Sequence, residues 1–233
     1  VATDNCDADV TDIVKVTGAF VPGALCPEAG TYTNTWTVTD NCGNVSAVYT
    51  QTITIIDTTA PTWTTAANAL DVTLECSDAA GLAAAQAMFP VATDNCDADV
   101  TDIVKVTGAF VPGAVCPEAG TYTNTWTVTD NCGNVSAVYT QTITIIDTTA
   151  PTWTTAPTAL DVTLECSDAA GLAAAQALFP VATDNCDTDV TDIVKVSGAF
   201  TAGAICPEAG TYTNTWTVTD NCGNVSAVYT QTI

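Results

Sequence analysis

The sequence has no histidine and no arginine, and its three lysines stand against 26 acidic residues, for a formal net charge of −23. Proteins bind nucleic acid and anionic lipid through clustered cations, so this balance excludes both as partners and favours cations instead. Acid–base catalysis is disfavoured too, because the acids recur in loops of every repeat without a histidine or a second cation beside them. We therefore predict that the chain is not an enzyme.

Long apolar runs are also missing. No stretch of eighteen apolar residues occurs, so we expect no direct insertion into a membrane. The eleven cysteines include no C-x-x-C motif, which together with the missing histidines disfavours a zinc site. Disulfides formed in an oxidising compartment explain them better, and we expect an extracellular or cell-surface location.

The most prominent feature of the sequence is a repeat of 90 residues. The segment VATDNCD begins at Val1, Val91 and Val181. Repeats of this length that are rich in short strands form whole sandwich domains in an array, not solenoid units. We divide the chain into residues 1–56 (copy one, the C-terminal part of a repeat), 57–146 (copy two, complete) and 147–233 (copy three, its last strand cut short). We also expect these residues to be a window in a much longer array.

The best-defined element is a β-hairpin that each copy repeats, at residues 30–53, 120–143 and 210–233. In its first arm Tyr122, Asn124, Trp126 and Val128 alternate with threonines, which is typical of a half-buried strand. Residues 130–134, DNCGN, supply turn chemistry, and residues 135–146 return as the second arm. The pattern predicts an all-β fold of tandem immunoglobulin-like β-sandwiches, although it does not explain Asn124 on the aromatic face.

The remainder of each copy must cover that hairpin. Leu70, Val72 and Leu74 alternate with polar residues and predict a strand with one buried face. Ser77-Asp78 then precedes AAGLAAAQAMF, whose alanines favour a short helix, with an irregular strand as the alternative because of Gly81. The short linker at residues 57–61 predicts contact between adjacent copies, with Trp63 close to the joint.

The pattern LDVTLEC…FPVATDNCD…GTYTNTWTVTDNCGN…TITIIDTTAP resembles the HYR-like repeats with four cysteines found in very large secreted surface proteins of the Bacteroidetes type. The resemblance covers the whole repeat and implies an extracellular immunoglobulin-like sandwich that serves in adhesion or as a stalk. Gliding-motility adhesins delivered by the type IX secretion system are similar in style. Gly120-Thr121-Tyr122 also resembles the tyrosine corner of immunoglobulin-like domains.

Strand directions in such a sandwich give an expected disulfide pairing. They put Cys76 and Cys116 at the end of copy two far from the entering linker, and Cys96 and Cys132 at the near end. We therefore predict these pairs: Cys76–Cys116, Cys96–Cys132, Cys166–Cys206, Cys186–Cys222 and Cys6–Cys42, with Cys26 bonded to a cysteine upstream of Val1.

The same topology gathers carboxylates at the joints, where no nearby cation neutralises them. The candidate ligands are Asp57, Asp94, Asp97, Asp99, Asp102 and Asp130 at one joint and Asp147, Asp184, Asp187, Asp189, Asp192 and Asp220 at the next. Oxygen-rich surroundings suit calcium, so we predict that calcium is the one cofactor. The alternative is that Asp94 and Asp130 only form turns while the other carboxylates are solvated.

Two modification signals occur. Asp57-Thr58-Thr59 and Asp147-Thr148-Thr149 resemble the Asp-Thr-x signal for O-glycosylation in Bacteroidetes secreted proteins, which makes Thr58 and Thr148 candidate sites in an exposed linker. Asn134-Val135-Ser136 is an N-glycosylation sequon, although Asn134 is better explained as the residue that completes the turn after Gly133.

Three functions fit these observations. We favour a structural and adhesive repeat region that forms a disulfide-stapled rod or filament on a bacterial surface. Its partners would be neighbouring identical repeats in the same chain and, beyond them, surface glycans or other filaments. The alternatives are accessory repeats of a large secreted hydrolase, or a glycan-binding module that uses the threonine faces of its strands.

Overall fold

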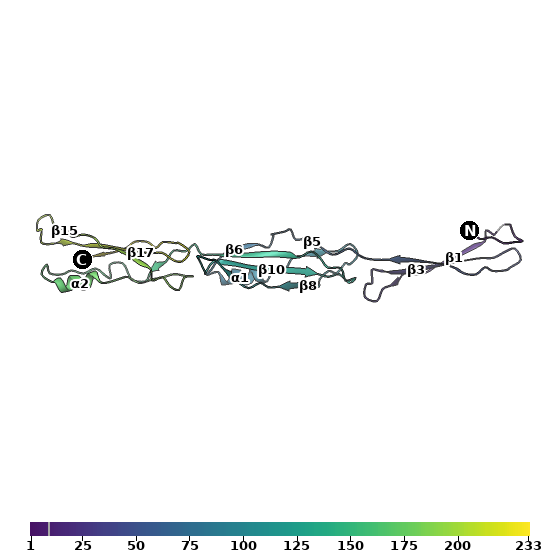
Figure 1. Cartoon of the computed structure of the whole chain (residues 1–233), viewed down its shortest axis with the longest axis horizontal. Coiled ribbons are helices and arrows are strands. Elements are labelled where there is room, and N and C mark those ends of the chain that lie inside the picture. Colours follow the sequence, from purple (N-terminus) through teal and green to yellow (C-terminus); the bar gives the residue numbers. More distant parts are fainter. Residues whose placement is uncertain (9) are drawn as a thin grey trace. The chain divides into compact units, whose positions relative to one another are not determined.

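The computed structural model describes residues 1–8 and 10–233 and confirms an all-β architecture of tandem immunoglobulin-like sandwiches, with short helices in copies two and three (Figure 1). It contains two compact units. Unit 1 comprises Val1–Ala69, Phe89–Val106 and Thr125–Thr140, and unit 2 comprises Leu70–Met88, Thr107–Asn124 and Gln141–Ile233. One part of copy two therefore belongs to the same compact unit as copy one, and the other part belongs to the same compact unit as copy three.

The strands of copy one are β1 (Ile13–Thr17), β2 (Val21–Pro22), β3 (Gly30–Val38) and β4 (Tyr49–Ile55). Copy two contains β5 (Thr62–Trp63), β6 (Val72–Glu75), α1 (Ala79–Gln86), β7 (Ala92–Thr93), β8 (Ile103–Val106), β9 (Val111–Pro112), β10 (Gly120–Val128) and β11 (Tyr139–Ile146). Copy three contains β12 (Thr152–Trp153), α2 (Ala169–Gln176), β13 (Ala182–Thr183), β14 (Ile193–Val196), β15 (Thr201–Ala202), β16 (Gly210–Thr211), β17 (Thr213–Val218) and β18 (Tyr229–Thr232).

The first hairpin arm organises the main sheet of each copy. In copy one, β3 pairs antiparallel with β1, β2 and β4. In copy two the strand order is β6-β11-β10-β8, with β9 also on β10, and β6 runs parallel to β11 in a register that sets Val72 opposite Ile143. Separate two-stranded ladders join β5 to β7 and β12 to β13, so copies two and three both have the second layer that a sandwich requires.

The alternation read from the first arm is confirmed. Asn124, Trp126 and Val128 are buried, while the threonines between them are partly or fully exposed. The arm ends at a turn in which Gly133 has a φ of +90°, a value that favours glycine because a side chain would clash there. The Asp130 carboxylate accepts the N–H groups of Cys132 and Asn134 and so fixes this turn.

The helix over the hairpin is also confirmed, and the alternative of an irregular strand is wrong. Asp78 caps α1 by accepting the Gly81 N–H at 2.8 Å. The buried face of α1 presents Ala85, which packs with Ile143 and Ile145 of β11. Partly buried side chains of β6 and α1 complete this core: Val72, Leu74 and Leu82.

Asn124 lies on the apolar face because it belongs to a buried amide network. Its Nδ2 donates to the Oε1 atoms of Gln86 and Gln141, each at 2.9 Å. Gln141 in turn donates to the carbonyl oxygens of Leu70 and Ala85, at 2.7 and 3.2 Å. Buried amides are costly unless they are hydrogen-bonded, so this network fixes one position of α1 over the hairpin. Copy three repeats it with Asn214, Gln176 and Gln231.

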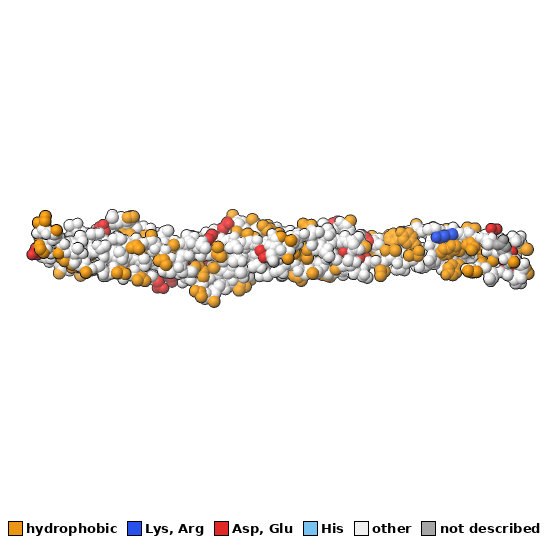
Figure 2. All heavy atoms as spheres, turned by 90° about the horizontal axis from the view of Figure 1, so that it is seen from above, with side chains coloured by type: hydrophobic (Ala, Val, Ile, Leu, Met, Phe, Trp, Pro, Cys, Tyr) orange, Lys and Arg blue, Asp and Glu red, His pale blue; other side chains and the backbone are white. Residues whose placement is uncertain are grey.

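Many apolar side chains remain at the surface. In Figure 2 the hydrophobic side chains are spread among polar ones over the face in view, and acidic side chains are scattered across it. The lysines lie against aromatic rings, with the Lys105 ammonium 5.2 Å from the Trp126 ring centroid and that of Lys195 5.0 Å from Trp216. Desolvation by burial lowers the pKa of both lysines.

Candidate functional site at the joints between copies

Three disulfides connect successive copies. Cys26 of copy one bonds Cys132 of copy two within unit 1. In unit 2, two bonds join copy two to copy three: Cys76–Cys186 and Cys116–Cys222. The Cα–Cα distances are 4.6, 6.0 and 4.6 Å in this order, all within the range that a disulfide spans. Each of the two compact units is therefore cross-linked across a joint between two copies.

The pairing predicted within each copy is wrong. Cys76, Cys116, Cys132, Cys186 and Cys222 all bond a cysteine of a neighbouring copy, and Cys26 bonds downstream to Cys132 rather than upstream. The physical reason is distance. The far-end cysteines of one copy meet the near-end cysteines of the next copy, so the closest partner lies across the joint. The predicted bonds Cys6–Cys42 and Cys166–Cys206 are not formed either.

Five cysteines are unpaired within the described residues: Cys6, Cys42, Cys96, Cys166 and Cys206. Each lies 90 residues, or twice that distance, from a cysteine that is bonded across a joint; Cys206, for example, corresponds to Cys116 and Cys42 to Cys132. Desolvation, followed by the negative charges of Asp57 and Asp94, raises the pKa of the Cys96 thiol. The unpaired cysteines therefore occupy the same repeat positions as the disulfide-bonded cysteines, and they do not form a separate class of site.

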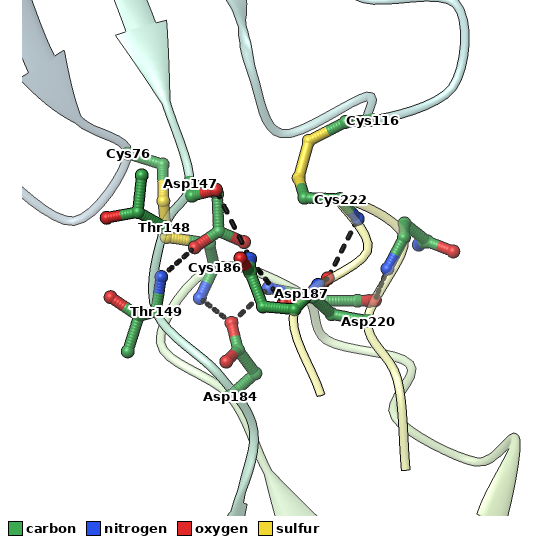
Figure 3. Close-up of a disulfide and its surroundings, with 12 residues drawn as sticks. Cys76, Cys116, Asp147, Thr148, Thr149, Asp184, Cys186, Asp187, Asp220 and Cys222 are labelled. Atoms are coloured by element: carbon green, nitrogen blue, oxygen red, sulfur yellow. Dashed lines mark hydrogen bonds between the residues drawn. A yellow bond between two sulfur atoms is a disulfide. The ribbon is translucent and has the colours of Figure 1, made fainter. Parts of the chain in front are cut away.

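Four carboxylates converge beside the disulfides of unit 2: Asp147, Asp184, Asp187 and Asp220 (Figure 3). Asp147 follows β11, Asp184 and Asp187 follow β13, and Asp220 stands in the hairpin turn after β17. Carboxylate oxygens of Asp147 and Asp220 and the sulfur of Cys222 lie within 4.8 Å of one another. Asp147, Asp187 and Asp220 are buried, with exposed fractions of 8 %, 3 % and 6 %.

Backbone N–H groups satisfy only part of this cluster. Asp187 accepts the N–H groups of Asp189 and Asn221, and the Asp220 carboxylate accepts those of Cys222 and Asn224. Asp147 and Asp184 use one oxygen in this way: Asp147 Oδ1 accepts the Thr149 N–H, and Asp184 Oδ1 accepts those of Cys186 and Asp187.

The second oxygens of Asp147 and Asp184 are buried without a hydrogen-bond partner, and so are those of Asp57 and Asp94 in unit 1. Desolvation by burial, and then the charges of Asp184, Asp220 and Glu75, raise the pKa of Asp147. At Asp130, burial alone would raise the pKa, but the hydrogen bonds from Asn134, Cys132 and Gly133 lower it on balance. Hydrogen bonds therefore stabilise the Asp130 carboxylate as an anion, whereas the Asp147 carboxylate is desolvated and lacks a partner for one oxygen.

The other predicted ligands are placed differently. Asp97 is buried, but its two oxygens accept the N–H groups of Asp99 and Asn131. The remaining four acids lie at the surface: Asp99, Asp102, Asp189 and Asp192. Asp94 and Asp130 do form the predicted turns, since Asp94 accepts the N–H groups of Cys96 and Asp97.

Sequence reasoning missed a second set of contacts between copies. The Thr148 hydroxyl and N–H both donate to the Glu75 carboxylate, and Asn185 donates to the Ser77 hydroxyl at 3.0 Å. Glu75 and Ser77 flank Cys76, so their position beside a joint cysteine was the available signal. Among the candidate modification sites, Thr58 and Thr148 are exposed. Asn134 donates its side-chain N–H to Asp130 at 2.8 Å, as expected of a turn residue.

Comparison with protein families gives a direct match. The family described as "HYR-like domain with 4 cysteines" matches residues 64–145 and 154–233, which together make up more than half of the chain. A search of curated proteins finds no match. In the described part of the chain, neither eight-residue helix has the length or apolar character needed to cross a membrane. The HYR-like domain is a non-catalytic adhesion-type module. Together with the three disulfides, this family indicates an extracellular repeat region of the adhesion type. The chain belongs to the family of HYR-like domains with four cysteines.

Proposed function

We propose that these repeats form the structural and adhesive part of a very long bacterial surface filament in which disulfides between copies carry tension. The observation that supports this proposal most directly is the shortest covalent route through the chain. Tensile force applied to the two ends of the chain does not have to pass through every residue of the backbone. It passes instead through the disulfides Cys26–Cys132 and Cys116–Cys222.

The length of this route can be counted. It has 25 peptide links from Val1 to Cys26, 16 from Cys132 back to Cys116, and 11 from Cys222 to Ile233, or 52 of the 232 links in the chain. At the maximum reach of an extended chain, the oxidised protein spans about 18 nm even when unfolded, against about 80 nm after reduction. The bonds between copies therefore limit extension far more than bonds within single copies would.

The segment that carries this tension in copy two is already extended. Cys116 and Cys132 flank β10, which runs from Gly120 to Val128 in the centre of the sheet. A β-strand rises about 3.3 Å per residue, close to the limit of the chain, so pulling releases little length. A segment that lengthens little under tension suits a stalk that holds an adhesive tip away from a cell. Delivery by type IX secretion, a role in gliding and contacts with surface glycans or other filaments are finer parts of the same proposal, which the resemblance suggests.

Single-molecule force spectroscopy on the oxidised chain, held at both ends, tests the proposal. The double variant Cys116→Ser/Cys222→Ser lengthens the shortest route from 52 to 122 links, because the route then runs from Val1 to Cys76 and from Cys186 to Ile233. We expect its maximum extension to rise from about 18 nm to about 42 nm.

The matched control is Cys76→Ser/Cys186→Ser, which also removes one disulfide but leaves the route of 52 links intact. Its maximum extension should equal that of the native chain. If both double variants extend equally, or if the oxidised native chain extends to the reduced length, the disulfides do not carry the tension and the proposal fails.

A further inference from the structure

Within the described residues, each joint holds buried carboxylate oxygens that have no hydrogen-bond partner. In unit 2 the Oδ2 atoms of Asp147 and Asp184 are both buried and unpartnered, and Asp147 is more than nine-tenths buried. The lysines stand elsewhere: Lys195 lies over Trp216 and donates to the Gln176 carbonyl, and Lys15 lies over Trp36. A buried carboxylate oxygen that lacks a hydrogen bond is costly, so such an oxygen indicates a missing partner.

The same pair of free oxygens occurs in unit 1. Asp57 and Asp94, the residues 90 positions before Asp147 and Asp184, also have a buried Oδ2 without a partner. In both units the first of the pair lies within 4.8 Å of the turn aspartate, Asp130 in unit 1 and Asp220 in unit 2. Two joints in separate compact units therefore present the same three carboxylates, from the linker, the following loop and the hairpin turn.

We propose that each joint binds one hard divalent cation of the calcium type, held by Asp147, Asp184 and Asp220 in unit 2 and by Asp57, Asp94 and Asp130 in unit 1. Asp147 contributes its free Oδ2 atom, and Figure 3 shows Asp184 as a neighbouring side chain of the same cluster. The ion replaces the missing hydrogen-bond partners and neutralises the repulsion between the carboxylates.

The donor set decides the class of metal. In unit 2 the cysteines grouped with the carboxylates, Cys186 and Cys222, are both bonded in disulfides, so they provide no thiolate for zinc or copper. In unit 1 Cys132 is bonded in the same way, whereas Cys96, the equivalent of Cys186, is unpaired beside Asp94; the donor set of unit 2 therefore identifies the class of metal. The donors that remain are carboxylate oxygens, with carbonyl oxygens and water to complete the shell, which are the ligands calcium prefers. Asp130 and Asp220 accept hydrogen bonds at both oxygens, as Asp97 and Asp187 do, but only Asp130 and Asp220 have a carboxylate oxygen grouped within 4.8 Å of Asp57 or Asp147, so they are the ligands chosen from these four.

Binding would add an ionic link between three segments, two of which already meet where the Asn224 side chain donates to the Asp147 carbonyl oxygen at 3.2 Å. Asp147 begins the linker, Asp184 follows β13, and Asp220 lies in the turn next to Cys222. An ion between them fixes the linker against the disulfide-bonded end of copy three. This role is additional to the proposed tensile function, because the covalent route does not pass through the ion.

The experiment is calorimetric titration of the oxidised full chain with calcium alone. We expect two ions per chain, with a dissociation constant of about 10⁻⁴–10⁻³ M, the range of extracellular modules. Asp147→Asn should leave one ion per chain, and Asp57→Asn/Asp147→Asn should leave none. The control Asp102→Asn/Asp192→Asn makes the same change of charge at exposed positions and should retain two ions.

Thermal unfolding supplies the second measurement. Without calcium, Asp57→Asn/Asp147→Asn should melt at or above the native temperature, since the two substitutions relieve repulsion at both joints. Calcium should raise the melting temperature of the native chain but not that of this double variant. Absence of saturable binding by the native chain overturns the proposal, as does equal loss of binding in the control, which would indicate a diffuse counter-ion effect. Failure here leaves the force measurement unaffected, so the two proposals are tested separately.

Discussion

The hairpins of copies one and two have the same sequence, residue for residue from Gly30–Ile53 to Gly120–Ile143, but different surroundings. Tyr139 and Ile143 are 5 % and 0 % exposed, whereas the equivalent Tyr49 and Ile53 are 70 % and 39 % exposed. In copy two, β6 and α1 pack on Ile143, and the Trp63 ring and the Ala66 carbonyl oxygen contact Tyr139; the described part of copy one has no such cover. Yet β3 and β10 are both nine-residue strands, so strand formation follows the local pattern while burial depends on the covering elements.

The polar network differs in the same way. In copy two Asn124 reaches both Gln141 and Gln86, and its Oδ1 accepts the Gly108 N–H at 3.3 Å. In copy one the equivalent Asn34 donates to Gln51 at 3.2 Å, and its Oδ1 is buried without a partner. Within the described residues the same hairpin sequence therefore occurs once with the covering elements and once without them, and three pairs of substitutions test what the cover contributes.

The largest effect is expected from Trp126→Ala compared with Trp36→Ala. Trp126 is fully buried between Phe89 and Tyr139, so its removal should cost about 3–5 kcal/mol of local stability. The same change at the partly exposed Trp36 should cost about 1 kcal/mol or less. Hydrogen exchange of peptides from each hairpin measures both values. Equal losses at the two positions would show that the cover over copy two adds nothing.

A smaller effect is expected from Asn124→Ala compared with Asn34→Ala. Loss of Asn124 removes the donor to the Oε1 atoms of Gln86 and Gln141 inside the sandwich, which should cost about 1–3 kcal/mol. Asn34 makes one such bond, so its removal should cost less, about 1 kcal/mol. Chemical denaturation followed by hydrogen exchange compares them. A larger loss at Asn34 would contradict the role assigned to the network.

The smallest effect is expected from Asp78→Ala, which removes the N-cap of α1 and should cost about 1 kcal/mol. Because α1 covers β11, amide exchange in β11 should accelerate towards that of the uncovered β4, while β18 under the unaltered α2 stays unchanged. The reciprocal substitution Asp168→Ala, which uncaps α2, should affect β18 alone. Acceleration of both strands by either variant would point to a general loss of stability instead.

Much of the fold was predictable because its signals are local. Alternation in GTYTNTWTV specifies a strand with one apolar face, and Asp130 and Gly133 specify the turn that follows it. Asp78 and the alanines after it specify the helix. The position of Asn124 was not predictable, because its partners Gln86 and Gln141 lie 38 and 17 residues away and meet it only when α1 packs on the sheet.

The sequence by itself determined the strands, the turn, the helix, the gathering of acids at each joint, and which cysteines share an end of a copy. Only the tertiary structure decided which cysteines bond. Cys132 and Cys222 have identical neighbours in the sequence, so no local signal separates a partner in the same copy from one in the next. A disulfide forms where two Cα atoms come within about 4.4–6.8 Å, and that proximity arises when one copy packs end-on against another.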